Sequence, residues 1–434
     1  MKLTVSNFRN IDNCCFNIID NRLILVGKNG VGKSNVLSAI YKGKYTFSKA
    51  REYEDVLYID PELSIDDDEV FEKDSIFIQL ISIIYNTDDD QTRYKYLLEE
   101  INDLLQPHNY SANIEINKLE DNYKSVFYKY CNKLASGLKR DLLYKFLYKI
   151  ATSNNDKKII ILIDSPEVYA HPSMIRSMCN ELKFLAEKGH LVIVSTHNAK
   201  VVETLSTDIR QISKLTLSDY KLKSYQIDID NYTSKLRKFY DSKNIFYLPN
   251  GRVNEALVHI VKNNLESFCK SFLRESVLKI LFTDYVLLGE GSSEEVLFHY
   301  IFTRMDYRTI KYFSDYNIDY VTGFGKFYMP FYFILANLYN IKVICVYDVD
   351  KLENKSHRAF YNAFSYYELN NKDVFTTIKM DPDLENELKI IQSKHRVEKP
   401  LNIFNEVFYR NNNVNNIVIK IKNAINDLNN DNIN

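Results

Sequence analysis

A phosphate-binding loop pattern near the start of the chain constrains its fold more than any other feature. Residues 27–34, Gly-Lys-Asn-Gly-Val-Gly-Lys-Ser, have the spacing G-x-x-x-x-G-K-S and stand between an apolar run at 23–26 and a helix-like stretch at 35–40. Glycines let backbone N–H groups close around phosphate oxygens, and the following helix directs its partly positive N-terminus at the same anion. The pattern therefore predicts a nucleoside triphosphate site, in which Lys33 reaches the terminal phosphates and Ser34 binds Mg²⁺. The loop residues of this site are Asn29, Gly30, Gly32, Lys33 and Ser34.

Length and composition set broad limits on the fold and the location. A chain of 434 residues is long enough for two or three domains, each with its own core. The six cysteines show no C-x-x-C pairing, which indicates reduced thiols rather than a zinc site or a disulfide framework. No apolar run approaches the length of a membrane span, and we expect a cytoplasmic protein with no membrane partner. The net charge of −1 gives no global basic field, although local basic surface remains possible.

Alternation of strands and helices predicts a parallel α/β sheet in the first half of the chain. Apolar strands are expected at 22–26, 159–163 and 191–194, with helices at 138–151 and 172–187 between them. The run 159–163 is continuously apolar, as in a strand covered on both faces.

Three further segments of this half are assigned from composition. Residues 52–72 are acidic and are expected to form an exposed loop, and Ser75 to Tyr85 is a strand candidate. Residues 91–135 are polar and helix-like, which suits an insert in the ATPase.

A second α/β pattern begins at residue 285. Strands are expected at 285–288, 318–321 and 342–347, with helices at 293–304 and 326–339. Between the two patterns, residues 233–280 are helical and carry little recognisable chemistry, which indicates a connector.

Several residues outside the loop have the chemistry of a nucleotide site. Asp164 ends the strand 159–163, where P-loop ATPases place the acid that holds the Mg²⁺ shell. Ser136 and Gly137 stand at a helix start that could offer amides to phosphate, and His197 follows the strand 191–194. An acid that only caps a helix and a structural histidine are the alternative interpretations.

In this order, the motifs resemble the ATPase domain of ABC-type DNA-repair proteins. Residues 5–11 look like the opening strand motif of that class, Ser136-Gly137 like its signature and His197 like its switch histidine. The resemblance implies a homodimer or higher oligomer, because two heads sandwich ATP in this class. The family pattern here is Asp-Glu-Pro-Glu. Glu167 matches its second Glu, but Ser165 replaces its first Glu, which is the general base in the family. Since a serine cannot accept a proton as a carboxylate does, we expect slow ATP hydrolysis.

A second set of acids follows two strands of the second pattern. Glu290 and Glu294 come after the strand 285–288, and Asp348 and Asp350 come after the strand 342–347. The carboxyl ends of neighbouring parallel strands are where α/β sheets build their sites, and carboxylates suit Mg²⁺. For either motif alone, acids that cap helices are the alternative interpretation.

Together these acids resemble a Toprim domain, and residues 275–302 resemble the domain junction of the OLD (overcoming lysogenization defect) family. That family joins an ABC ATPase to a C-terminal Toprim nuclease, and the Gabija nuclease subunit is a similar member. Residues 323–326 resemble its middle loop. Residues 381–387 resemble its later acidic stretch, where the metal ligand is Glu385 or Glu387. Lys399 or Lys394 matches a lysine that could neutralise a phosphate transition state.

The resemblance implies an α/β fold, with an ABC-type P-loop ATPase head followed by a Toprim α/β domain. The expected division is an ATPase domain at 1–232 with a helical insert at about 91–135, a helical connector at 233–280, and a Toprim nuclease domain with a C-terminal extension at 281–434. The expected catalytic residues are Glu290, Glu294, Asp348, Asp350 and Lys399. The expected metal ligands are Ser34, Asp164, Glu290, Glu294, Asp348, Asp350 and Glu385. The expected nucleotide-binding residues beyond the loop are Ser136, Gly137, Asp164, Glu167 and His197.

The sequence thus predicts an ATP-regulated, Mg²⁺-dependent endonuclease that cleaves DNA, with Mn²⁺ or Ca²⁺ as substitute ions in the Toprim site. By resemblance, its role is bacterial anti-phage defence, and a helicase or another defence protein is a candidate partner. Two alternatives stay open: an ATPase that scans or clamps DNA and cuts nothing, and a Toprim effector that cleaves RNA.

Overall fold

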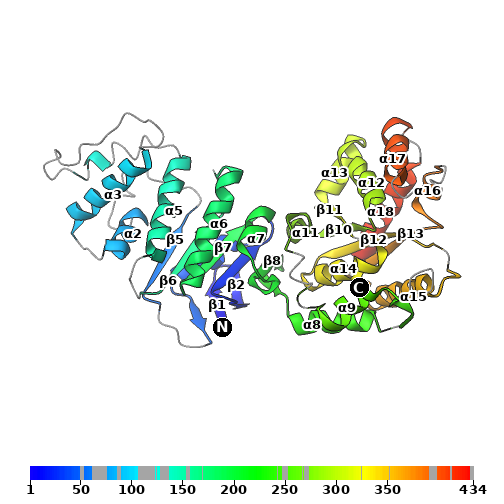
Figure 1. Cartoon of the computed structure of the whole chain (residues 1–434), viewed down its shortest axis with the longest axis horizontal. Coiled ribbons are helices and arrows are strands. Elements are labelled where there is room, and N and C mark those ends of the chain that lie inside the picture. Colours follow the sequence, from blue (N-terminus) through cyan, green and yellow to red (C-terminus); the bar gives the residue numbers. More distant parts are fainter. Residues whose placement is uncertain are drawn as a thin grey trace. The chain divides into compact units, whose positions relative to one another are not determined.

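The protein forms two compact units in a computed structural model, Met1–Ser224 and Tyr225–Asn434 (Figure 1). The described residues are 1–48, 53–60, 76–85, 89–105, 123, 125–127, 136–152, 157–168, 170–241, 243–246, 253–265, 267, 273–323, 325–350, 352–390, 398–410 and 413–430. The three-part division with a connector at 233–280 stays a prediction. No described helix is both long enough and apolar enough to cross a membrane.

A six-stranded sheet lies at the centre of the first unit. Its strand order is β5-β6-β7-β3-β8-β9, and the pairs from β5 to β8 are parallel. Its strands are β3 (Arg22–Val26), β5 (Asp55–Ile59), β6 (Ile159–Asp164), β7 (Leu191–Thr196), β8 (Ile212–Ser218) and β9 (Lys221–Gln226). All residues of β3, β6 and β7 are buried, which is the expected state of central strands with both faces covered.

The remaining elements of this unit are a small sheet and a set of helices. The small sheet is antiparallel, in the order β2-β1-β4. Its strands are β1 (Lys2–Phe8), β2 (Ile11–Asn17) and β4 (Tyr45–Phe47). The helices are α1 (Lys33–Tyr41), α2 (Ile76–Tyr85), α3 (Asp90–Leu105), α5 (Ser136–Thr152), α6 (Pro172–Glu187), α7 (Ala199–Leu205) and the 3₁₀ turn η3 (Ile209–Gln211).

Two predictions in this unit were wrong. The strand candidate at 75–85 is helix α2, in which Leu80 and Ile81 are fully buried and Phe77 packs on Phe146 of α5 with ring centroids 6.1 Å apart. A short, largely apolar run has no clear periodicity that separates a buried helix from a buried strand. The expected loop at 52–72 contains strand β5, which pairs with β6, and its residues 61–72 lie outside the described residues. The expected insert at 91–135 includes helix α3, and much of its remainder also lies outside them.

The second unit is built on a four-stranded parallel sheet with the order β11-β10-β12-β13. Its strands are β10 (Tyr285–Gly289), β11 (Ile318–Thr322), β12 (Lys342–Asp348) and β13 (Phe375–Met380). The chain runs from β10 to β11 on one side of β10, and then crosses to β12 on the other side. The carboxyl ends of β10 and β12 therefore meet at a topological switch point, where open α/β sheets bind their ligands.

Helices cover both faces of this sheet (Figure 1). On one face, α12 and α13 pack on β11, and α18 packs on β12 and β13. On the other face, α14 packs on β10 and β12, and α8 packs on α14. The elements are α8 (Ile229–Phe239), η4 (Lys243–Phe246), α9 (Glu255–Asn263), α11 (Glu275–Leu278), η5 (Lys279–Phe282), α12 (Ser292–Thr303), α13 (Tyr307–Asp315), η6 (Lys326–Tyr328), α14 (Met329–Leu338), α15 (Lys355–Asn370), α16 (Leu384–Glu387), α17 (Glu398–Asn405), the π-helical turn η7 (Glu406–Arg410) and α18 (Val414–Asn430).

Candidate functional site

The phosphate-binding loop joins β3 to α1 in a conformation that its glycines permit. Gly30 and Gly32 have φ angles of +79° and +109°, which favour glycine. Gly27 allows a close approach, because a Cβ there would lie 2.5 Å from the carbonyl oxygen of Leu215. Gly32 caps α1 without a side-chain hydrogen bond, so the first N–H groups of the helix can face an anion.

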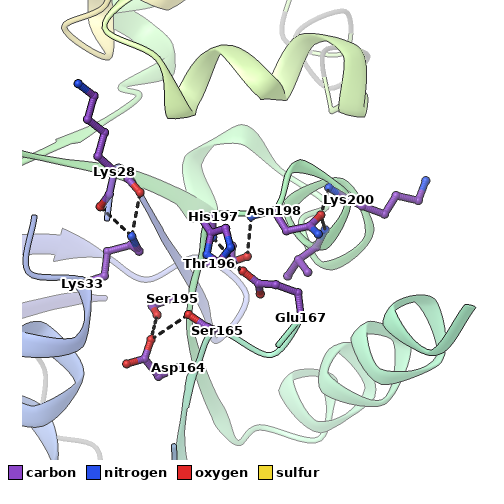
Figure 2. Close-up of polar contacts among 12 residues, drawn as sticks. Lys28, Lys33, Asp164, Ser165, Glu167, Ser195, Thr196, His197, Asn198 and Lys200 are labelled. Atoms are coloured by element: carbon purple, nitrogen blue, oxygen red, sulfur yellow. Dashed lines mark hydrogen bonds and ion pairs between the residues drawn. The ribbon is translucent and has the colours of Figure 1, made fainter. Parts of the chain in front are cut away.

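Lys33 is folded back onto this loop. Its Nζ donates hydrogen bonds to the carbonyl oxygens of Gly27 at 2.8 Å and Lys28 at 2.9 Å (Figure 2). Burial lowers the pKa of Lys33, and the negative charges of Asp164 and Glu167 oppose that effect. Asn29 and Ser34 are exposed. The lysine therefore has carbonyl partners that phosphate oxygens could replace.

Asp164 lies at the end of β6 with its carboxylate held by three hydroxyl groups. Ser195 Oγ donates to Asp164 Oδ1, and so does Ser165 Oγ at 3.4 Å (Figure 2). Tyr58 Oη donates to the other oxygen at 3.5 Å, and burial together with the charge of Asp164 raises the pKa of Tyr58 to about 12. The structure thus brings the predicted Mg²⁺-shell acid into electrostatic contact with the P-loop lysine.

Glu167 and His197 form a pair beside this acid. Glu167 Oε1 lies 3.1 Å from His197 Nδ1 and accepts a hydrogen bond from the His197 backbone N–H, also at 3.1 Å (Figure 2). Glu167 is buried and His197 is half exposed. The pair fixes the histidine at the end of β7, so its imidazole can meet a bound nucleotide.

Ser165 is not placed to act as a general base. Its φ is +48°, its backbone N–H donates to the Ser195 carbonyl oxygen at 2.9 Å, and its hydroxyl is committed to Asp164. Ser136 and Gly137 are the first residues of α5, but their side chains lie outside the described residues, so their role at phosphate stays a prediction.

Sequence reasoning gave no role to a chain of polar contacts that supports the P-loop from β1. Arg9 donates to Asn35 Oδ1 at 2.6 Å, Asn35 donates to Asn10 Oδ1 at 2.8 Å, and Asn10 donates to the Val31 carbonyl oxygen at 3.4 Å. A Cβ on Gly32 would meet the Asn10 amide at 3.0 Å. The resemblance of residues 5–11 to an opening motif was the available signal for Arg9 and Asn10.

In the second unit, the acids that follow β10 and β12 lie side by side. Glu290 Oε1 accepts a hydrogen bond from the backbone N–H of Asp348 at 2.9 Å. Asp348 Oδ1 in turn accepts one from the N–H of Leu384 at the start of α16, also at 2.9 Å. Gly289, the last residue of β10, permits this packing because a Cβ would lie 2.5 Å from the Cβ of Glu294. The switch point therefore holds carboxylates from both strands.

Lys326 lies among these carboxylates, and sequence reasoning did not foresee its position. Its Nζ donates to Asp350 Oδ2 and to the Asp348 carbonyl oxygen, and lies 3.5 Å from Glu290 Oε1. Its side chain is only 6% exposed. The loop before it is tied to β10, because the N–H of Gly325 donates to the Glu290 carbonyl oxygen at 2.8 Å. An ammonium group thus holds a position where several carboxylate and carbonyl oxygens converge.

Glu294, Glu385 and Lys399 are the remaining predicted residues of this site, and their contacts differ. Glu294 is buried and closes the start of α12 through a hydrogen bond from the Gly291 N–H at 2.9 Å. Glu385 is 2% exposed and forms an ion pair of 2.7 Å with Lys399. The charges of Glu385 and Asp348 raise the pKa of Lys399 although burial lowers it.

The sequence left two choices open, Glu385 or Glu387 as metal ligand and Lys399 or Lys394 as the lysine. In each case the geometry favours the first residue. Glu387 points to α18, where Lys420 Nζ lies 2.7 Å from its Oε1, so Glu385 is the acid next to the cluster. Lys399 belongs to the same neighbourhood, whereas Lys394 lies outside the described residues.

The oxygen donors suit a hard divalent cation such as Mg²⁺. As they stand, however, no three acidic, histidine or cysteine side chains in the described part of the chain are gathered for metal binding. The reason is visible at the cluster, since Asp350 is turned to Lys326 and Glu290 to a backbone N–H. A metal held by Glu290, Asp348 and Asp350 would need Lys326 to give up its contact with Asp350.

The site carboxyls should make metal binding depend on pH. Burial raises the pKa values of Glu290, Glu294 and Asp348 to about 7, and neighbouring carboxylates add to the rise. In the unfolded chain these carboxyl groups lose their protons near pH 4 to 4.5, whereas in the folded state they keep them up to about pH 7. Stability without metal should therefore fall as pH rises to about 7 and then level off.

Because Mn²⁺ competes with the same protons, its apparent affinity should rise at least about tenfold between pH 6 and pH 8 for one displaced proton. Thermal unfolding over a Mn²⁺ titration at each pH measures this affinity. Asp348→Asn should weaken the dependence, and an equal affinity at both pH values would contradict the assignment.

Comparisons with known proteins give matches in both units of the chain. An AAA ATPase domain model matches residues 75–202, and the TOPRIM domain model of overcoming lysogenization defect protein-like sequences matches residues 281–350. The Old nuclease of Escherichia phage P2 is 25% identical over 167 residues, which are 38% of this chain and 24% of that protein. Residues 281–350 therefore match a Toprim domain of the OLD-like type. The chain spans about a quarter of the length of the Old nuclease that it matches.

Solved structures resemble the chain less closely. The ATP-binding subunit of an ABC transporter has 13% identity and a TM-score of 0.35, over 61% of this chain and 100% of that chain. The SMC head domain from Thermotoga maritima has 11% identity and a TM-score of 0.28, over 52% of this chain and 98% of that chain.

Proposed function

We propose that this chain is an OLD-like, ATP-regulated, Mg²⁺-dependent endonuclease that cleaves DNA. The observation that carries the proposal is the meeting of Glu290, Asp348 and Asp350 at the switch point of the second sheet, around the ammonium of Lys326. A pair of divalent ions there would activate water and stabilise the leaving oxygen of a phosphodiester. The chain would hold the ions with Glu290, Glu294, Asp348 and Asp350.

Glu385 and Lys399 would support this chemistry from beside the cluster. Their ion pair of 2.7 Å fixes the Lys399 ammonium in the neighbourhood of Asp348. A cation in that position stabilises the charge that develops on a phosphate in the transition state.

ATP would act mainly as a regulator. We propose a homodimer in which two ATPase units enclose ATP. Bound ATP would shift the equilibrium between an open and a closed form of the dimer, which requires that ATP bind one form more tightly than the other. The likeness to the Gabija nuclease subunit supports anti-phage defence as the role and a helicase or other defence protein as the partner.

The direct test is a cleavage assay with the full chain. Supercoiled plasmid and tRNA are incubated separately with Mg²⁺, with Mn²⁺ and with EDTA, each with and without ATP. We expect metal-dependent nicking or linearisation of the plasmid and an effect of ATP on its rate. Cleavage of tRNA alone would replace DNA by RNA as substrate, and no cleavage of either would support the non-cutting ATPase.

ATP hydrolysis should be slow because the site lacks a carboxylate base at position 165. General base catalysis contributes about 10²–10⁴-fold, so Ser165→Glu should raise the steady-state rate of phosphate release by at least about tenfold. Ser165→Ala is the control and should leave the rate unchanged, since the hydroxyl is bonded to Asp164. A large loss of hydrolysis in Ser165→Ala would instead make Ser165 a catalytic residue.

A further inference from the structure

A groove in the second unit lies between α8 and α15. It has a volume of about 750 Å³, and it is lined by basic, aromatic and amide side chains, with no acid among its lining residues. The basic residues are Lys235 and Lys238 of α8 and Lys355 and Arg358 of α15. All four are exposed. This concentration of positive charge is local, because the whole chain has a net charge of −1.

The walls of the groove are held in place by aromatic packing. Phe239 of α8 contacts Phe360 and Phe364 of α15, with ring centroids 5.7 Å apart in both cases. Both pairs have the edge-to-face arrangement that aromatic rings favour. The cations therefore stand on two helices with a fixed separation, rather than on a loop.

The N-terminal end of α15 lies beside the proposed metal site. His357, one helical turn within α15, has its Nδ1 3.6 Å from Asp350 Oδ2, and its sequence neighbours Lys355 and Arg358 line the groove. Arg358 is oriented by a hydrogen bond from its Nε to the Leu352 carbonyl oxygen at 2.9 Å. From Lys355 to Tyr366 the groove wall extends about 16 Å at 1.5 Å per residue.

An aromatic side chain in the groove indicates which form of nucleic acid it would accept. Tyr366 is 58% exposed, and Lys238 Nζ lies 5.9 Å from its ring centroid. Exposed aromatic rings beside cations are what proteins use to stack the bases of single strands while lysine and arginine contact the phosphates. A duplex keeps its bases paired and stacked inside, out of reach of such a ring.

We propose that this groove binds a single strand of nucleic acid that leads to or from the metal site. The inference rests on the proposed nuclease function and adds the path of the strand. The four basic residues of the groove bind phosphates, and Tyr366 stacks on a base. These basic residues are Lys235, Lys238, Lys355 and Arg358.

The test is binding by fluorescence anisotropy with the full chain and labelled 15-nucleotide strands of thymidine or uridine, in EDTA and over a range of salt. Lys238→Gln combined with Arg358→Gln should weaken binding about tenfold at moderate salt. It should also reduce the slope of log affinity against log salt by about 1.4, since each phosphate contact on a single strand contributes about 0.7. Tyr366→Leu should weaken binding about tenfold with an unchanged slope, because it removes stacking and no charge.

Arg308→Gln is the matched control, because Arg308 is exposed on α13 at the other face of the sheet. It should leave affinity and slope unchanged. The groove proposal is overturned if the double variant binds like the wild type or if the wild type binds neither strand. The nuclease proposal fails separately, through an absence of cleavage by the wild type. Thymidine against uridine then distinguishes DNA from RNA.

Discussion

Replacing Glu290 by glutamine should reduce metal-dependent strand cleavage by about 10²–10³-fold, the usual effect of losing one contribution to transition-state stabilisation, because Glu290 is a proposed ligand of the catalytic ions. The change removes one negative charge from the cluster, while the amide oxygen can still accept the hydrogen bond that Glu290 Oε1 takes from the Asp348 N–H. The fold should therefore survive, and because burial opposes the charge of Glu290, thermal stability without metal should not fall. Plasmid cleavage, Mn²⁺ titration and thermal unfolding of the same preparation measure the three effects.

Glu387→Gln is the matched control for this experiment. It makes the same chemical change on α16, but Glu387 is paired with Lys420 and points away from the cluster. It should cleave like the wild type. If Glu290→Gln keeps both cleavage and Mn²⁺ affinity, the reaction takes place elsewhere in the chain. If it loses cleavage and keeps affinity, Glu290 acts on the substrate rather than on the metal.

The sequence was sufficient for the features that local chemistry determines. The P-loop needs glycines at fixed spacing, and the runs at 159–163 and 191–194, which are apolar throughout and rich in β-branched residues, favoured buried strands. The acids of the second site were found because carboxylates stood immediately after two such runs, at Glu290 and Asp348. In each case the residue and its structural context are neighbours in the chain.

Other features depend on tertiary structure and gave no local signal. Lys326 comes 22 residues before Asp348 and has no special neighbours except glycines, so its place in the cluster follows only from how its loop is tied to β10. Strand β13 is not uniformly apolar, and its pairing with β12 decides its state. Helix α18 is rich in asparagine, and its buried face of Ile417, Ile421 and Ile425 is spaced by four residues, which a count of composition does not detect.

Lys326 has a second consequence, for metal affinity. Its ammonium is close to Glu290 and Asp350 and is almost fully buried, so it neutralises the oxygens that a metal would use. Lys326→Met keeps the length and apolar stem of the side chain but removes the charge. At pH 8, Mn²⁺ affinity should then rise at least about tenfold, which corresponds to about 1.4 kcal/mol. Without metal, the free energy of unfolding should fall by about 3–5 kcal/mol, the usual effect of removing one partner of a buried ion pair.

Lys379→Met is the control, since this lysine lies on β13 of the same sheet and contacts the hydroxyl and ring of Tyr361. It should change neither quantity appreciably. Isothermal titration with Mn²⁺ and denaturant unfolding in EDTA separate the two predicted effects, and neither depends on cleavage. Competition between the ammonium and the metal requires that affinity and stability without metal move in opposite directions. If both fall together in Lys326→Met, the lysine positions the carboxylates for the metal instead of competing with it.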